Sequence, residues 1–142
     1  MKVLVDTNVA LDILLNRGAF YSNSMAVFVL AEQNLITGHI SASAVTDIFY
    51  IAKKQLGKNV AQEAIKRLLQ VFLPATVTGN NIYQALDLAW DDFEDSVQFT
   101  VGEALSADFI VTRNTQDFDS GSISAVTPEQ FIQTITEISN NY

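Results

Sequence analysis

The sequence has no cysteine and only one histidine among its 142 residues. Without cysteine the chain can form no disulfide bond and no thiolate metal site, and it has no cysteine nucleophile. The single histidine, His39, is expected to be structural. This composition is compatible with a reducing compartment, and we expect a cytoplasmic protein.

Long apolar runs are also missing, since none approaches the roughly 20 residues that span a bilayer. The first residues, MKVLVDTN, include an acid and form no basic and apolar signal stretch, so no membrane association is expected. With only 2 prolines, 6 glycines and 49% hydrophobic residues, the chain is neither disordered nor collagen-like. We expect a single domain over residues 1–138 and a polar tail over residues 139–142.

Basic residues are scarce: eight lysines and arginines stand against sixteen acids, which gives a net charge of −8. This balance argues against tight, nonspecific nucleic-acid binding driven by net charge. The segment from Lys53 to Arg67 differs, because five basic residues against one acid give it +4 and leave −12 for the rest. Two interpretations remain open: a solvated helical face, or a local surface for phosphates.

Hydrophobic periodicity predicts strands that alternate with helices. The expected strands cover residues 2–5, 35–41, 75–78, 109–112 and 124–127. The expected helices cover residues 9–14, 22–34, 44–56, 59–72, 80–90 and 91–105, and a last one begins after Thr127. This order predicts a parallel α/β sheet covered on both faces, with ligands bound beyond the carboxyl ends of the strands.

Acidic residues recur where such a site is expected. Asp6 follows the first strand directly, and either a site carboxylate or a simple helix cap would explain it. Asp47 lies on the third expected helix, where a lone acid is usually solvated. The stretch DDFED opens another helix; Asp92 and Glu94 are expected to cap it and to favour its dipole, with Asp95 left for a site. Asp117 lies shortly after the fourth expected strand.

The segments VDTNVALDIL, VTDIFYIAKK, DFEDSVQ and FIVTRNTQDF resemble the four sequence blocks of PIN-domain ribonucleases, closest to bacterial VapC-like toxins and their solitary relatives. The resemblance implies a PIN-like three-layer α/β/α fold with a central parallel sheet of about five strands. It also implies that four acids converge on one or two Mg²⁺ or Mn²⁺ ions. These acids are Asp6, Asp47, Asp95 and Asp117.

The family most often has Glu at the second acid, so the shorter Asp47 is expected to reach the metal through water. The neighbouring polar residues implied to support the site or to touch substrate are Thr7, Asn8, Thr112, Arg113 and Asn114. The resemblance further implies hydrolysis of RNA, a homodimer, and a basic antitoxin that presents Arg or Lys to the carboxylates. Phe20, Tyr21 and Tyr50 are candidates for the dimer surface or, equally, for the core.

Elementary electrostatics agrees with the metal expectation. Two carboxylates 4 Å apart repel by roughly 4 kcal/mol at an effective dielectric of 20, so a cluster needs protons or cations. A hard cation with oxygen ligands satisfies that need, and its bound water supplies a nucleophile. No phosphate-binding GxxxxGK[ST] loop is present, and Asn8 stands where a haloacid dehalogenase-type phosphatase needs Asp. The main alternative is a PIN-fold module that binds RNA or protein without cutting.

Overall fold

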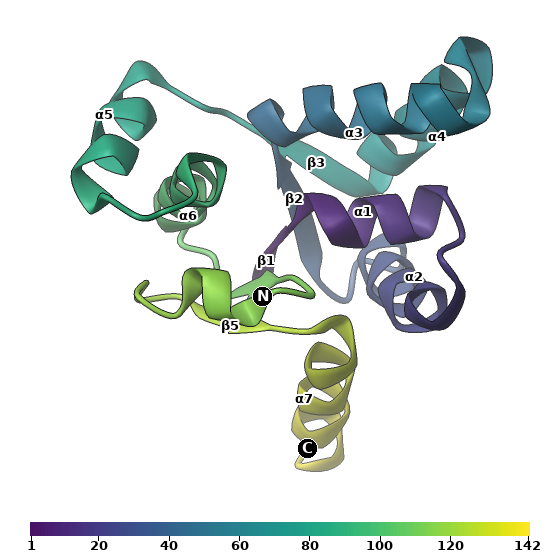
Figure 1. The fold of residues 1–142 in the computed structure, drawn as a ribbon. Coiled ribbons are helices and arrows are strands. Elements are labelled where there is room, and N and C mark those ends of the chain that lie inside the picture. The colour runs from purple at the N-terminus through teal and green to yellow at the C-terminus, as the bar shows by residue number, and fades with distance from the viewer.

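The computed structural model describes residues 1–142, and its strands and helices alternate through most of the chain (Figure 1). The elements are β1 (Lys2–Val5), α1 (Thr7–Leu14), α2 (Gly18–Glu32), β2 (Thr37–Ser41), α3 (Ala42–Leu56), α4 (Lys58–Val71), β3 (Phe72–Ala75), α5 (Gly79–Leu88), α6 (Phe93–Leu105), β4 (Phe109–Val111), the short 3₁₀ helix η1 (Thr115–Phe118), β5 (Ser124–Val126) and α7 (Pro128–Asn140).

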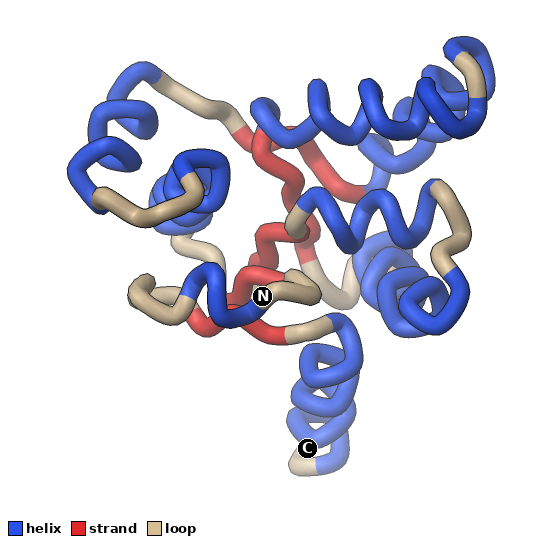
Figure 2. Tube along the Cα trace, in the orientation of Figure 1, coloured by secondary structure: helices blue, strands red, loops and turns tan.

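All five strands form one parallel sheet in the order β3-β2-β1-β4-β5, at the centre of the molecule (Figure 2). Leu4 of the central strand β1 pairs with His39 of β2 on one side and with Ile110 of β4 on the other. The chain builds outward from β1 through β2 and β3, and then returns to add β4 and β5 on the opposite side. The carboxyl ends of β1 and β4 therefore form a topological switch point, where open α/β sheets bind ligands.

The side chains of β1 point alternately to two separate hydrophobic cores. Val3 and Val5 are fully buried in the larger core, which α1 to α4 complete together with Phe131 of α7. Leu4 lies in the smaller core on the opposite face, with residues of α6 and η1. Helices thus cover both faces of the sheet, and the predicted three-layer α/β/α fold with about five parallel strands is confirmed.

Side-chain caps explain where several helices begin. The Ser41 hydroxyl accepts a hydrogen bond from the Ala44 backbone N–H at the start of α3, 3.2 Å away. A reciprocal pair between Thr127 and Gln130 opens α7, as the sequence predicts. Gly57, with φ +81°, separates α3 from α4 in a conformation that favours glycine.

Three local expectations need correction or comment. The third strand covers residues 72–75 rather than 75–78, so Phe72 is a strand residue and is fully buried. Pro74 lies within this strand, which is at the sheet edge, where proline's missing N–H is tolerated. Ser139 and Asn140, expected in the polar tail, belong to α7. His39 lies inside β2, where burial and nearby Lys2 lower its pKa.

None of the helices combines the length and the apolar character that crossing a membrane requires.

Two leucines on helices distinguish core packing from surface exposure. Leu68 of α4 is 2% exposed in the larger core, whereas Leu86 of α5 is 58% exposed. We expect Leu68→Ala to lower the free energy of unfolding by about 2–5 kcal/mol, because it removes buried contacts and leaves a cavity. Leu86→Ala should change it by less than about 1 kcal/mol. Urea unfolding measures both, and equal effects would contradict this assignment of the core.

Candidate active site

A buried carboxylate, Asp6, occupies the switch point between β1 and β4. Its side chain is 6% exposed and accepts four hydrogen bonds. One oxygen, Oδ1, accepts from the Thr7 backbone N–H at 2.7 Å and from Gln98 Nε2 at 3.0 Å. The other, Oδ2, accepts from Thr112 Oγ1 at 2.7 Å and from Asn8 Nδ2 at 3.3 Å. Asp6 therefore caps α1 and is also held in one orientation at the sheet edge.

The loop after β4 is tied to the start of α1 by further hydrogen bonds. Thr112 is fully buried, and its hydroxyl accepts from the Asn114 backbone N–H at 3.1 Å. The Arg113 backbone N–H donates to Asn8 Oδ1 at 3.2 Å. The polar residues expected near the site thus all interact with Asp6 or with its direct partners, Arg113 through its backbone N–H. They are Thr7, Asn8, Thr112, Arg113 and Asn114.

Asp95, in the first turn of α6, lies next to Asp6 and to Asp117 of η1. Burial and, in decreasing order, the negative charges of Asp92, Asp6, Asp117 and Glu94 together raise the pKa of the Asp95 carboxyl to about 7. Asp95 and Asp117 also line one surface pocket of about 360 Å³. Of the four acids proposed from the sequence, Asp95 and Asp117 thus share a pocket, and the charge of Asp6 also acts on Asp95.

The fourth, Asp47, is an exposed residue of α3 and reaches the group through Glu94. The pKa of Glu94 is raised to about 7, first by burial and then by the charge of Asp47, a hydrogen bond with Asp47 and the charges of Asp6 and Asp92. Thr7 Oγ1 donates to Glu94 Oε1 at 3.5 Å. Glu94 therefore does more than favour the start of α6, because the charges of Asp47 and Asp6, two of the acids expected at the site, both act on its carboxyl.

The first turn of α6 separates the roles of its acids. Asp92 is the N-cap, and its Oδ1 accepts from the Asp95 backbone N–H at 3.0 Å, which confirms the expected capping role. Gln98, which the sequence analysis missed, is 1% exposed and donates to Asp6. It follows Asp95 by three residues and Glu94 by four, so helical spacing alone places it on their side of α6. That spacing is the one sequence signal that points to it.

The donor chemistry of this group fits a hydrated divalent cation. All the clustered groups are carboxylates, which are the ligands of hard cations, and two of them have pKa values raised by burial and by their neighbours' charges. No three acidic or histidine side chains are close enough to form a preassembled metal cage. Mg²⁺ often binds through one or two carboxylates and keeps several waters, so such a cage is not required.

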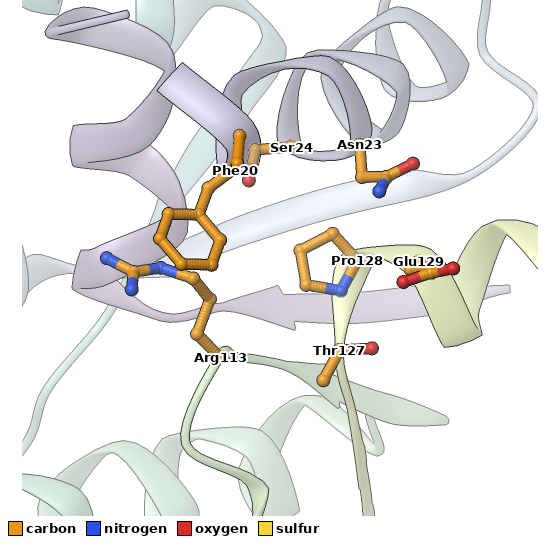
Figure 3. Close-up of a pocket in the computed structure, with 8 residues that line it drawn as sticks. Phe20, Asn23, Ser24, Arg113, Thr127, Pro128 and Glu129 are labelled. Atoms are coloured by element: carbon orange, nitrogen blue, oxygen red, sulfur yellow. The ribbon is translucent and has the colours of Figure 1, made fainter. Parts of the chain in front are cut away.

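The Arg113 side chain contacts Asp12 and Phe20 and not the clustered carboxylates. Its Nε lies 2.8 Å from Oδ2 of the fully buried Asp12, and one terminal nitrogen donates to Oδ1 at 3.1 Å. The guanidinium also lies 4.1 Å from the centre of the Phe20 ring. Figure 3 shows this stack at one side of a pocket of about 240 Å³, with Pro128 at the other. The Arg113 guanidinium thus contacts Asp12 and Phe20, while the Arg113 backbone N–H donates a hydrogen bond to Asn8.

A parallel α/β sheet with clustered carboxylates at its switch point defines a class of protein whose site suits divalent-metal chemistry. Residues 2–116 match the PIN domain family, and the chain belongs to that family. A search of curated proteins finds no sequence match.

Several solved structures share the fold. VapBC2 from Rickettsia felis, bound to a promoter DNA fragment, superposes with a TM-score of 0.69 at 17% identity, covering 89% of this chain and 98% of that one. The Mycobacterium tuberculosis toxin VapC20, which cleaves the sarcin–ricin loop, gives 0.62 at 17% identity, covering 76% and 86%. A toxin–antitoxin complex from Klebsiella pneumoniae gives 0.62 at 21% identity, covering 89% and 97%.

The raised pKa values of Glu94 and Asp95 predict a pH-dependent cost in stability. In the unfolded chain both carboxyls ionise near their ordinary pKa values of 4.5 and 3.8, but in the folded protein near 7. The folded state binds more protons between these limits, so stability is lost as pH rises from about 4 through 7. In metal-free buffer, the Tm of the Glu94→Gln/Asp95→Asn double variant should therefore exceed that of wild type by an amount that grows as pH rises.

The expected gain is a few degrees at pH 8 and close to zero at pH 4, because solvent screens partly exposed carboxyls. Thermal unfolding across this pH range measures it. Asp87→Asn, on an exposed position of α5, is the matched control and should show no such trend. A difference between the double variant and wild type that does not change with pH would contradict the electrostatic explanation.

Proposed function

We propose that the protein is a Mg²⁺- or Mn²⁺-dependent endoribonuclease that hydrolyses RNA phosphodiester bonds. The observation that carries this proposal is the gathering of carboxylates from separate elements at the β1–β4 switch point. Asp6 comes from the end of β1, Asp95 from α6, Asp117 from η1 and Asp47 from α3. Membership of the PIN domain family supports the same reading.

In this proposal Asp6, Asp95 and Asp117 hold the cation directly, and Asp47 acts through water or through Glu94. When bound, the metal polarises the scissile phosphate and lowers the pKa of a water molecule that serves as nucleophile. Thr112 and Gln98 orient Asp6, so that its carboxylate is fixed before substrate arrives.

The residues Asn8 and Asn114 complete the proposed support of the site, since Asn8 bridges Asp6 and the loop after β4. Glu94 and Asp95, with pKa values near 7, each have access to protonated and ionised forms around neutral pH. Binding of a cation would favour the ionised forms and lower both pKa values.

Removal of the central acids tests the catalytic assignment. We expect Asp6→Asn and Asp95→Asn each to reduce RNA cleavage with Mg²⁺ or Mn²⁺ by more than about 100-fold, beyond the loss typical of a residue that only supports a metal ligand. Single-stranded and structured RNAs should be assayed by gel electrophoresis, with and without chelator. Asp87→Asn is the control that should keep full activity. Cleavage that survives the Asp6→Asn/Asp95→Asn double variant would refute the site.

Two observations favour a second candidate, a PIN-fold module that binds RNA or protein without cutting. No three acids form a ready metal cage, and Asp47 is shorter than the Glu usual at its position. The cleavage assay separates the candidates, because a binding module retains RNA affinity and shows no metal-dependent cleavage in the wild-type protein.

We further propose that the protein is the toxin of a toxin–antitoxin pair, acting as a homodimer in the cytoplasm. The fold similarity to VapBC2 and to the Klebsiella pneumoniae toxin–antitoxin complex supports this assignment. The net charge of −8 and the carboxylate cluster complement a basic partner. An Arg or Lys of the antitoxin placed at the cluster would act in place of the metal charge.

Growth measurements test the toxin role. Induced expression of the wild-type chain in bacteria should slow growth, whereas Asp6→Asn, which removes the central carboxylate, should not. Western blotting must show equal levels of both proteins. Normal growth with soluble, RNA-cleaving wild-type protein would refute the toxin assignment and leave the nuclease assignment standing.

A further inference from the structure

One face of α3 leads directly away from the acidic cluster. Asp47, Tyr50 and Lys54 stand at positions i, i+3 and i+7 of this helix, which places them in one line along its surface. At 1.5 Å per residue, Lys54 lies about 10 Å beyond Asp47 along the axis. In Figure 1, α3 runs from the centre of the molecule to the outer turn that joins it to α4.

These side chains have no evident role in packing. Tyr50 is 60% exposed, although tyrosine carries a large apolar ring, and Lys54 is exposed as well. The Lys54 ammonium lies 4.5 Å from the centre of the Tyr50 ring. The helix packs instead through Ala44, Ile48 and Ala52, which lie on a different side and are buried. An aromatic ring and a cation are thus displayed together on the surface.

The hairpin formed by α3 and α4 carries most of the positive charge of the molecule. Its exposed cations are Lys53, Lys54 and Lys58 at the turn, and Lys66 and Arg67 further along α4. Only Glu63 opposes them, 3.4 Å from Lys66, so the segment from Lys53 to Arg67 has a net charge of +4 on a chain of net charge −8. A polyanion is therefore attracted to this hairpin more than to the remaining, acidic surface.

We propose that the face of α3 formed by Tyr50 and Lys54 binds a single-stranded part of the RNA substrate and leads it from the acidic cluster to the basic α3–α4 turn. A base stacks on the Tyr50 ring, and Lys54 pairs with the backbone phosphate. The distance from Asp47 to Lys54 corresponds to about three nucleotides at the stacked rise of 3.4 Å each. The position of this track beside the cleavage site rests on the proposed ribonuclease function.

The charge and the aromatic ring on this face argue for RNA as the occupant. RNA supplies both missing complements, a base face for the ring and phosphates for the cations.

Binding measured without cleavage tests the track. Fluorescence anisotropy of a labelled, mixed-sequence 12-nucleotide RNA, with the full chain in Ca²⁺ buffer, gives Kd at several salt concentrations. We expect Tyr50→Ala to weaken binding roughly 5- to 100-fold, the range for loss of one stacked base, and Tyr50→Phe to bind as wild type. Lys54→Ala should reduce the slope of log Kd against log salt by about 0.7, the value for one contact with single-stranded phosphate.

Two controls match these changes. Tyr83→Ala removes a tyrosine that is 71% exposed on α5, and Lys66→Ala removes a cation from α4. Tyr83→Ala should leave Kd unchanged, and Lys66→Ala should weaken binding less than Lys54→Ala. Circular dichroism and gel filtration check that each variant keeps its fold and oligomeric state.

The outcomes separate this proposal from the nuclease assignment. Loss of binding in Tyr50→Ala, with Tyr50→Phe intact, supports the track even if the wild-type chain cuts no RNA. Wild-type cleavage together with unchanged Kd in Tyr50→Ala and Lys54→Ala would overturn the track and leave the nuclease standing. A change of oligomeric state in Tyr50→Ala without a change in RNA affinity would assign this face to self-association and also overturn it.

Discussion

The buried carboxylate of Asp6 is the constraint on which the site depends. A charge that is 6% exposed requires hydrogen-bond donors, and its donors come from the start of α1, from α6 and from the end of β4. These partners are brought together only when β1 and β4 pair in the correct register. The hydrogen bonds that hold Asp6 therefore depend on the register of the sheet.

The same arrangement brings carboxylates close enough to repel one another. Glu94 and Asp95 face other acids, and their pKa values near 7 show that the folded protein disfavours their charges. Hydrophobic packing on both faces of the sheet fixes the elements that carry them. Local strain of this kind is what a ligand can relieve on binding, which gives a cation or a basic side chain a source of affinity.

The positive charge of Arg113 lies near the carboxylate cluster but does not neutralise it. Its guanidinium forms an ion pair with Asp12, which is fully buried, and rests on Phe20. If the guanidinium turned instead toward the carboxylates, it would leave Asp12 as a buried charge with only Arg17, at 3.8 Å, as a cationic partner. The pair therefore anchors the loop after β4 and keeps the cluster electronegative.

The sequence predicted the sheet class and most element positions, because these follow from local periodicity and from the order of elements. It also placed Asp6 and Asp117 after strand ends, whereas a metal site formed by four acids was implied only by the family resemblance and stays a prediction. It misplaced β3 because Phe72 continues the helical spacing of α4 and is nevertheless a buried strand residue. Gln98 and the partner of Arg113 were beyond its reach. Gln98 lies 92 residues from Asp6 and Asp12 lies 101 residues from Arg113, and only the folded chain shows that these groups meet.

Net charge is a poor guide to what such a molecule binds, because charge acts over short distances in physiological salt. The screening length there is about 8 Å, so a phosphate near Lys54 responds mainly to its immediate surroundings. Along α3 those surroundings change from carboxylates at Asp47 to cations at Lys54 within about two helical turns. A chain of net charge −8 can therefore present a local surface for a polyanion.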